Sequence, residues 1–204
     1  MLDIVFEDHS ILVINKPTGV LSQPGKTMDG SVDTAVKQYI DQYDGPTLVH
    51  RLDMDTSGLM VFAKNVESHR CLHQQFERRL IQKRYTAVLV NVPTGLGGRI
   101  ELPLMPDYVN RPRQKVAAEG KLSITTWQKI GAGGNRIHLY PLTGRTHQLR
   151  VVAASNRGLS SAILGDRLYG SSSLSDRLHL HADFLSLIHP TTSHRVHFKS
   201  SAPF

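Results

Sequence analysis

The chain has 204 residues, enough for one compact domain with a substantial core. Hydrophobic residues make up 40% of it and charged residues 20%, a composition that argues against a disordered chain. Lys and Arg total 24 against 17 acidic residues, a net charge of +7. This basic excess favours a polyanionic partner, nucleic acid first, although an ordinary basic surface has the same signature.

The cysteine content and the length of the longest apolar run exclude several classes of protein. Cys71 is the one cysteine, which excludes an intrachain disulfide and a Cys-based zinc site. The longest apolar run, Leu59 to Ala63, is too short to span a membrane, and the first residues do not resemble a signal peptide. We therefore expect a cytoplasmic protein without membrane contact. No exposed apolar stripe is evident, so we expect a monomer.

The first half of the chain is predicted to mix short strands with two helices. Apolar residues at helical spacing predict a helix over residues 32–40, with Ser31 as its N-cap, and a second helix over residues 67–80. Residues 25–30 read as a loop and residues 50–58 as a connection between strands. The β-branched and apolar runs predict strands over residues 4–6, 11–14, 47–49 and 59–63.

The second half is predicted to be richer in strands. Residues 103–120 read as a long loop, residues 171–173 as a surface loop, and a short helix is expected to start near His147. The strands are expected over residues 85–90, 123–130, 136–140, 185–188 and 195–198. Many strands, few helices and hairpin-like spacing predict an α+β domain with a mixed, mostly antiparallel sheet flanked by helices and loops.

The segment His50-Arg51-Leu52-Asp53-Met54-Asp55-Thr56-Ser57-Gly58 carries the candidate chemistry. It lies between two predicted strands, where a scaffold presents reactive groups. An arbitrary aspartate in such a loop more often caps a turn. The string His-Arg-Leu-Asp-x-x-Thr-Ser-Gly, however, resembles the signature of the RluA family of pseudouridine synthases, a far more specific pattern than a lone glycine motif.

Further segments resemble the same family in the same order, so that the similarity covers residues 4 to about 199. Residues 102–116 are most similar to the small dual-specificity member, which acts on a tRNA anticodon loop and a large-subunit rRNA hairpin. Val152 stands where the family usually has His, which puts the local packing and one RNA contact in question. The matching segments are Asn15-Lys16-Pro17-Thr18-Gly19-Val20, Lys83-Arg84-Tyr85, residues 142–150, Ile163-Leu164-Gly165-Asp166 and Tyr169-Gly170.

The resemblance implies an isomerase that detaches uracil from its ribose, turns it and rejoins it through carbon, with no metal and no organic cofactor. It implies that Asp53 is the catalytic carboxylate, acting either by addition to the sugar or by removal of a ribose proton. It further implies that Arg145 keeps Asp53 ionised and that Tyr85 stacks on the uracil.

A base inside a stacked loop must be flipped out to reach Asp53. The resemblance suggests that Arg51 fills the vacated stack, and a salt bridge from Arg51 is the alternative. Each basic residue taken singly is as readily a solvated charge as a phosphate contact. The remaining candidate RNA-binding residues are His50, Arg111, Arg113, Lys115, His147 and Arg150.

Other interpretations stay open at this point. The chain could be a non-catalytic RNA-binding protein on the same fold, or a synthase acting on another rRNA or tRNA uridine. A hydrolase using Ser57 lacks a Gly-x-Ser-x-Gly elbow, and the histidines lack metal-ligand spacing. We expect residues 1–204 to form the catalytic domain, without the small N-terminal S4-like RNA-binding domain of many relatives.

Overall fold

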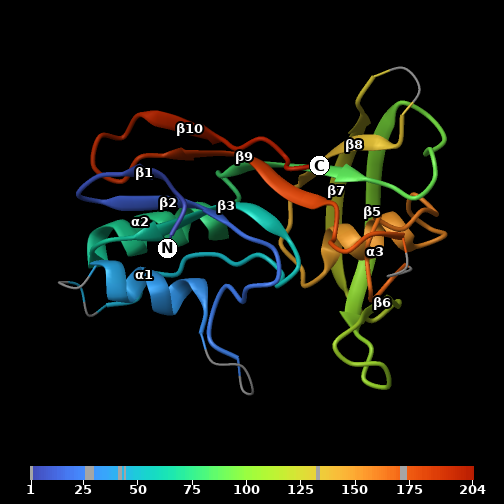
Figure 1. Cartoon of the computed structure of the whole chain (residues 1–204), viewed down its shortest axis with the longest axis horizontal. Coiled ribbons are helices and arrows are strands. Elements are labelled where there is room, and N and C mark those ends of the chain that lie inside the picture. Colours follow the sequence, from blue (N-terminus) through green and yellow to red (C-terminus); the bar gives the residue numbers. More distant parts are fainter. Residues whose placement is uncertain (1, 26–29, 41–42, 44, 132–133, 171–173) are drawn as a thin grey trace. The chain divides into compact units, whose positions relative to one another are not determined.

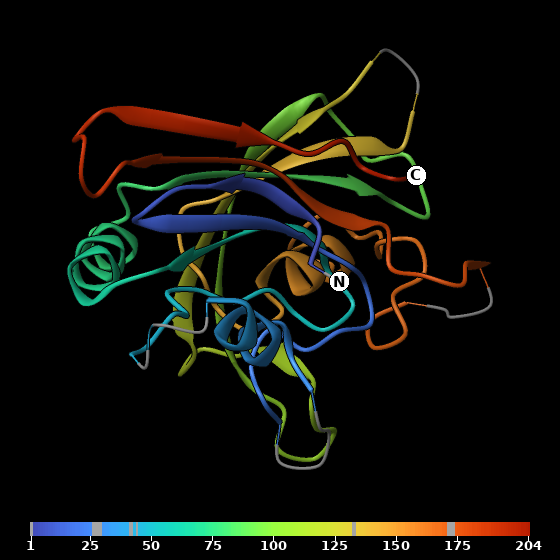
Figure 2. The same ribbon diagram turned by 60° about the vertical axis from the view of Figure 1, so that its left-hand side comes forward.

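The computed structural model describes residues 2–25, 30–40, 43, 45–131, 134–170 and 174–204. It divides the chain into two compact units (Figures 1 and 2). Unit 1 holds the chain up to Lys83 together with His181–Pro203, and unit 2 holds Arg84–Leu180 with Phe204. Within the described residues, no helix has the length and apolar character needed to cross a membrane.

Unit 1 contains five of the strands of the ten-stranded sheet, paired in the order β1-β2-β3-β9-β10. The pairs are antiparallel except β3 with β9, which run parallel. Almost all of β9 belongs to this unit. The strands are β1 (Ile4–Glu7), β2 (Ile11–Lys16), β3 (Ser57–Ala63), β9 (Leu180–Ile188) and β10 (Arg195–Lys199).

Two helices, α1 (Val32–Ile40) and α2 (Val66–Glu77), lie beside this sheet (Figure 1). Ser31 Oγ accepts a hydrogen bond from Thr34 N at 3.1 Å, which confirms the predicted N-cap of α1. All seven residues of β3 are buried, so both of its faces are covered. Leu72 of α2 joins the apolar cluster of β2, β3 and β9 on one of these faces. The sequence around Asp53 therefore continues into a rigid central strand.

Unit 2 holds a second five-stranded antiparallel arrangement, in the order β4-β8-β7-β5-β6, and the helix α3 (Gln148–Ala154). Its core joins β4, β7 and β8 to Leu149 and Ala153 of α3. A second cluster packs Val151 and Val152 of α3 against Leu102 and Leu104 of β5. The strands are β4 (Gln82–Val88), β5 (Gly97–Pro106), β6 (Gln114–Val116), β7 (Lys121–Lys129) and β8 (Arg136–Pro141).

This is the α+β class with a mixed, mostly antiparallel sheet that the sequence predicts. Three local predictions are wrong. Residues 47–49 are not a strand, because only Leu48 forms an isolated bridge, to Phe62. Residues 103–120 are not one loop, because β5 extends through Pro106 and pairs with β6. The second helix ends at Glu77 rather than Leu80. Residues 26–29 and 171–173 of the expected loops lie outside the described residues.

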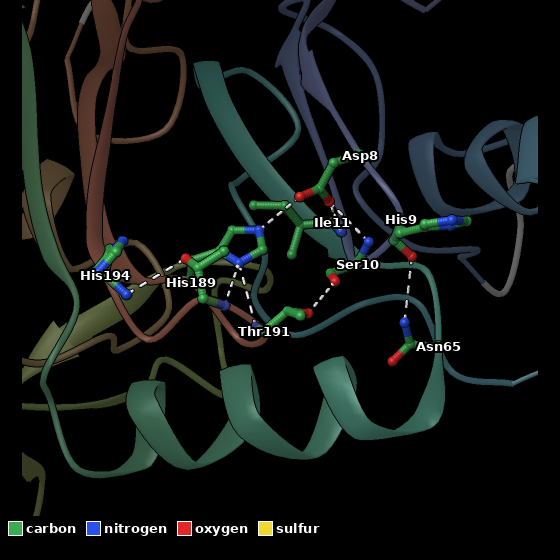
Figure 3. A network of polar contacts seen from close by, with 9 residues as sticks. Asp8, His9, Ser10, Ile11, Asn65, His189, Thr191 and His194 are labelled. Carbon is green, nitrogen blue, oxygen red and sulfur yellow. Dashed lines mark hydrogen bonds and ion pairs between the residues drawn. The ribbon is translucent and has the colours of Figure 1, made fainter.

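A partly buried polar network joins the β1–β2 turn to the segment after β9 in unit 1 (Figure 3). Asp8 Oδ1 accepts the backbone N–H groups of Ser10 and Ile11 at 2.8 and 2.9 Å, and Asp8 Oδ2 lies 2.8 Å from His189 Nε2. His189 Nδ1 accepts from Thr191 N at 3.3 Å, so Nε2 carries the proton that bonds Asp8. The network ties the two ends of the unit 1 sheet together.

Candidate active site

The loop that carries Asp53 is fixed by hydrogen bonds with Ser22, 30 residues earlier in the chain, and by a hydrogen bond within the loop. Ser22 Oγ donates to Leu52 O at 2.7 Å and accepts from Leu52 N at 3.0 Å, so one hydroxyl satisfies both backbone groups of a buried residue. Thr56 N donates to Asp53 O at 3.1 Å and closes a turn. The half-buried Asp53 side chain therefore stands on an ordered turn that leads directly into β3.

The last residue of β2, Lys16, lies beneath this turn. Its side chain is fully buried, at 0% exposure, and its ammonium group donates three hydrogen bonds. They go to Pro17 O and Val20 O at 2.8 Å and to Met54 O at 2.9 Å. One cation thus joins the loop after β2 to the residue next to Asp53. Gly19 N adds a bond to Met54 O at 2.9 Å.

Burial lowers the pKa of Lys16 to about 8, while the nearby carboxylates of Asp55 and Asp53 act in the opposite direction. The ammonium group is therefore still mostly charged at neutral pH. A positive charge under the turn favours anionic side chains on it. The buried Lys16 cation thus lies under the loop that carries the half-buried side chains of Asp53 and Asp55.

His50 opens the loop and is a packing residue in this structure. Its ring stacks on Phe76 with centroids 4.6 Å apart, and its Nε2 accepts a hydrogen bond from Val61 N at 3.0 Å. Burial, with a smaller effect of Lys83, lowers the pKa of His50 to about 3. The imidazole is therefore neutral, and it contacts α2 through Phe76 and β3 through Val61. Arg51, the next residue, is exposed.

The far end of the loop is held by β9 of the same unit. Ser57 Oγ and His181 Nδ1 lie 2.9 Å apart, and His181 Nε2 lies 3.2 Å from Ser200 Oγ. Gly58 pairs with Ala182 and has φ +117°; a Cβ there would stand 2.4 Å from Ala182 N. Only glycine allows this approach of the two strands. Ser57 is therefore a buried support of the loop rather than an exposed nucleophile.

In unit 2, Tyr85 lies in β4 opposite Leu139 of β8. The half-buried ring packs against the apolar cluster that contains Ala87 and Leu139. One side of the tyrosine is thus fixed by the core, as expected for a strand residue. A ring held in this way can also present an edge or a hydroxyl with little loss of conformational freedom.

Arg145 lies in the tight turn before α3, and Gln148 organises that turn. Gln148 Oε1 accepts from Thr143 Oγ1 at 2.8 Å and from Arg145 N at 3.0 Å. Its Nε2 donates to Ile124 O at 3.1 Å and to Thr125 Oγ1 at 3.0 Å in β7. The Arg145 side chain itself donates from Nε to Leu122 O at 3.2 Å. Both the backbone and the guanidinium of Arg145 are thereby oriented by β7.

The two other candidates on α3 differ from each other. His147 is the N-cap residue in a left-handed conformation, φ 52°, and its Nδ1 lies 2.9 Å from Tyr169 Oη. Arg150 is only 2% exposed and makes a bidentate pair with the fully buried Asp166, at 2.7 and 2.8 Å. The guanidinium of Arg150 is thus committed inside unit 2, and we do not retain it among the RNA contacts.

The three remaining basic candidates lie on the β5–β6 hairpin, which projects past the end of its strands in Figure 1. Arg111, Arg113 and Lys115 are all exposed. The Arg111 guanidinium carbon lies 5.6 Å from the Tyr108 ring centroid, and that of Arg113 lies 5.3 Å from the Tyr169 ring centroid. The hairpin therefore carries a cluster of cations held beside aromatic rings, a surface suited to phosphates and unstacked bases.

Comparison with known sequences assigns this arrangement to a family. The RNA pseudouridylate synthase family profile matches residues 10–155. The chain belongs to this family. It is 40% identical over 210 residues to the dual-specificity RNA pseudouridine synthase RluA of Salmonella typhimurium, covering 100% of this chain and 94% of that one. It is 43% identical over 199 residues to the Vibrio vulnificus protein of the same name, covering 92% and 78%.

Solved structures show the same fold. Human RNA pseudouridylate synthase domain containing 1 is 27% identical, with a TM-score of 0.80 over 100% of this chain and 84% of its own. Human RNA pseudouridylate synthase domain containing 4 is 24% identical, with a TM-score of 0.78 over 98% and 88%. The predicted family and fold class are confirmed. The protein is an RNA pseudouridine synthase, an isomerase that converts uridine in RNA to pseudouridine.

The structure adds supporting residues to those predicted from sequence. Lys16, Gln148 and Tyr169 each lie in a segment that matched the family, yet no role was assigned to them. The sequence marked these three residues only by placing them in segments that resemble the family. Val152, which stands where the family usually has His, is fully buried among apolar side chains, so this departure is a packing change.

Proposed function

We propose that Asp53 is the catalytic carboxylate of this synthase. The observation that supports the assignment most strongly is the ordered turn that carries Asp53, fixed by Ser22 and by the buried ammonium group of Lys16. In the reaction the N1–C1′ bond of the uridine breaks, a C5–C1′ bond forms, and the C5 proton is exchanged for one on N1. Asp53 either adds to the sugar or removes a ribose proton, and it is regenerated at the end.

Tyr85 and Arg145 complete the proposed catalytic set. We assign Tyr85 to stacking on the detached uracil, because its ring is fixed by the unit 2 core. We assign Arg145 to the role of ionic partner of Asp53 that the family resemblance implies, and its orientation by Gln148 and Leu122 supports a fixed position for its guanidinium. Arg51 is proposed to fill the gap left by the flipped base, where an exposed planar guanidinium can stack.

The proposed substrates are a tRNA anticodon stem-loop and a 23S rRNA hairpin. The relatives bear the name dual-specificity RNA pseudouridine synthase, and the predicted similarity to the dual-specificity member lies in residues 102–116. These residues form the hairpin with the exposed cations Arg111, Arg113 and Lys115, which we propose contact the RNA together with His147. We further propose that residues 1–204 act as a monomeric catalytic domain in the cytoplasm.

The assignment of Asp53 is tested with Asp53→Asn, which keeps the shape and removes the charge. Pseudouridine formation in a stem-loop should fall by at least about 1,000-fold, with the RNA Kd within about twofold of wild type. Asp55→Asn is the matched control, because Asp55 lies on the same loop and also acts on Lys16. Wild-type activity in Asp53→Asn would exclude the assignment.

The substrates are tested by carbodiimide mapping of pseudouridine in tRNA and rRNA from a strain lacking the gene. Loss of one site in a tRNA anticodon loop and one in a 23S hairpin is the expected result. If both sites kept their pseudouridine and a different site lost it, the proposed substrates would be wrong and the enzyme would act on that other uridine.

A further inference from the structure

Tyr169 occupies the junction of two parts of unit 2 that are proposed to handle RNA. Its half-buried ring packs against the cluster formed by β5 and α3. Its hydroxyl accepts a hydrogen bond from Gln114 N in β6 at 2.6 Å and lies 2.9 Å from His147 Nδ1. A single phenol oxygen thus joins the edge strand of the hairpin to the first turn of α3.

The turn that carries Tyr169 is itself fixed. Asp166 Oδ1 accepts from Leu168 N at 2.9 Å and from Tyr169 N at 3.0 Å. The same carboxylate pairs with Arg150, and both side chains are buried. Hydrogen bonds and charge pairing at a buried carboxylate resist rearrangement. The Tyr169 hydroxyl is therefore a fixed point, and the hairpin is the part that depends on it.

The tip of the hairpin is closed by hydrogen bonds within the hairpin itself, since Asp107 N donates to Arg113 O and Arg113 N donates to Asn110 O, both at 2.9 Å. The strand β6 has three residues and pairs with β5 over these three positions. Beyond them, Tyr108 and Val109 are 63% and 88% exposed. Arg113 lies immediately before Gln114 and its guanidinium stands over the Tyr169 ring at 5.3 Å. The direction of the exposed cations is thus set close to the Gln114–Tyr169 bond.

We propose that Tyr169 is a positioning residue for RNA recognition, whose hydroxyl aligns the cations of the β5–β6 hairpin with the start of α3. This inference rests on the proposed function, in which the hairpin binds RNA. Tyr169 has no part in the chemical step, because Arg145 is oriented by Gln148 and Leu122 instead. Its loss should therefore act on RNA affinity rather than on kcat.

The test is Tyr169→Phe, which removes one oxygen and keeps both the ring and every charge of the protein. The Kd for an anticodon stem-loop should rise about five- to tenfold, with kcat at saturating RNA within about twofold of wild type. The slope of log Kd against log salt should become shallower, because misaligned cations neutralise fewer phosphates. A loss of global stability alone would not change this slope, since no charge is removed.

Two controls make the result specific. Tyr140→Phe removes a tyrosine hydroxyl for which no partner is found among the described residues, and it should leave Kd and slope unchanged. Backbone amide exchange should accelerate at Gln114 in Tyr169→Phe and not in Tyr140→Phe, because only Tyr169 accepts from that amide.

A double-mutant cycle identifies the route of the effect. In a protein with Arg111, Arg113 and Lys115 all changed to Ala, Tyr169→Phe should cost no further affinity, because the groups it aligns are gone. An equal cost in both backgrounds, or a Tyr169→Phe protein with wild-type Kd and slope, would overturn the inference. Binding is measured without turnover, so failure of the Asp53 assignment, read from Asp53→Asn activity, is separate from failure here.

Discussion

At the residue scale, the buried lysine Lys16 most strongly shapes the candidate site, and its burial could not be predicted from the sequence. Lysine is seldom fully buried, and Lys16 reaches this state because three carbonyl groups satisfy its ammonium group. Those carbonyls belong to the loop after β2 and to the Asp53 loop. The Lys16 ammonium group therefore holds these two loops together by hydrogen bonds.

Replacing Lys16 by Met tests this role. The change removes the ammonium donor from three carbonyls, of which Met54 O keeps Gly19 N as a donor, and should lower the free energy of unfolding by about 3 kcal/mol, measured by urea denaturation. It should also lower kcat more than it raises KM, because the Asp53 turn loses its support. Lys37→Met is the control, since the exposed Lys37 pairs with the buried Asp33 one helical turn away and should cost less than about 1 kcal/mol. Equal costs would contradict the role.

His50 makes the unit 1 core sensitive to acid. Its pKa is about 3 when folded and near its ordinary value of 6.5 when unfolded, so below pH 6.5 the unfolded chain takes up a proton that the folded one does not. The stabilisation is complete above pH 6.5 and is lost at up to about 1.4 kcal/mol per pH unit as the pH falls towards 3.

The pH effect is measured by urea denaturation of wild type and His50→Gln at pH 7.5 and pH 5. Wild type should lose about 1–2 kcal/mol more than the variant over this interval. Glutamine is chosen because its amide oxygen can accept from Val61 N without titrating. Identical losses in both proteins would show that His50 does not titrate on unfolding.

At the element scale, the sequence predicted strands well where one face alternates and less well elsewhere. The strand β9 was foreseen only over its last residues, because its first half carries the polar residues His181 and Asp183, which are buried here. Seven of the nine residues of β9 are buried. The strand β5 was missed altogether, since no strand was expected over residues 97–106, and its last part was assigned to a loop because proline normally ends a strand prediction. Arg79, at φ 58°, ends α2 early without the glycine that usually marks such a stop.

The candidate site shows the same division. The loop around Asp53 and the turn around Arg145 could be located from local motifs. The Arg150–Asp166 pair could not, because it joins residues 16 positions apart, and a motif arginine followed by no acidic neighbour reads as an exposed cation. The roles of Lys16 and Tyr169 likewise depend on contacts with distant backbone groups, which no local pattern encodes.

The close approach of β3 and β9 yields a prediction at this scale. Gly58→Ala places a methyl group 2.4 Å from the Ala182 backbone and should destabilise the protein by more than about 3 kcal/mol, measured by thermal and urea denaturation. Gly95→Ala is the matched control: Gly95 also has a positive φ, +86°, but nothing lies within 4 Å of its added Cβ. It should cost only about 1 kcal/mol, and equal costs would mean that backbone strain rather than contact dominates.

At the scale of the whole molecule, the net charge of +7 is explained by the RNA on which the enzyme acts. A basic excess that was compatible with any polyanion now belongs to an enzyme that acts on RNA, and three of its exposed cations lie on one hairpin of unit 2. Charges of this kind act on encounter and binding, whereas the isomerisation is carried out by a few fixed groups.

The two steps should therefore respond differently to salt. Three phosphate contacts predict a fall of about 30-fold in kcat/KM when salt rises from about 50 to 200 mM, because counterion release drives binding. The single-turnover rate of preformed enzyme–RNA complex should stay within about twofold over the same range. Changing Arg111, Arg113 and Lys115 to Ala should flatten the first curve and leave the second unchanged. If salt slowed the preformed complex as steeply as it lowers kcat/KM, the cations would be acting in the chemical step rather than in capture of the RNA.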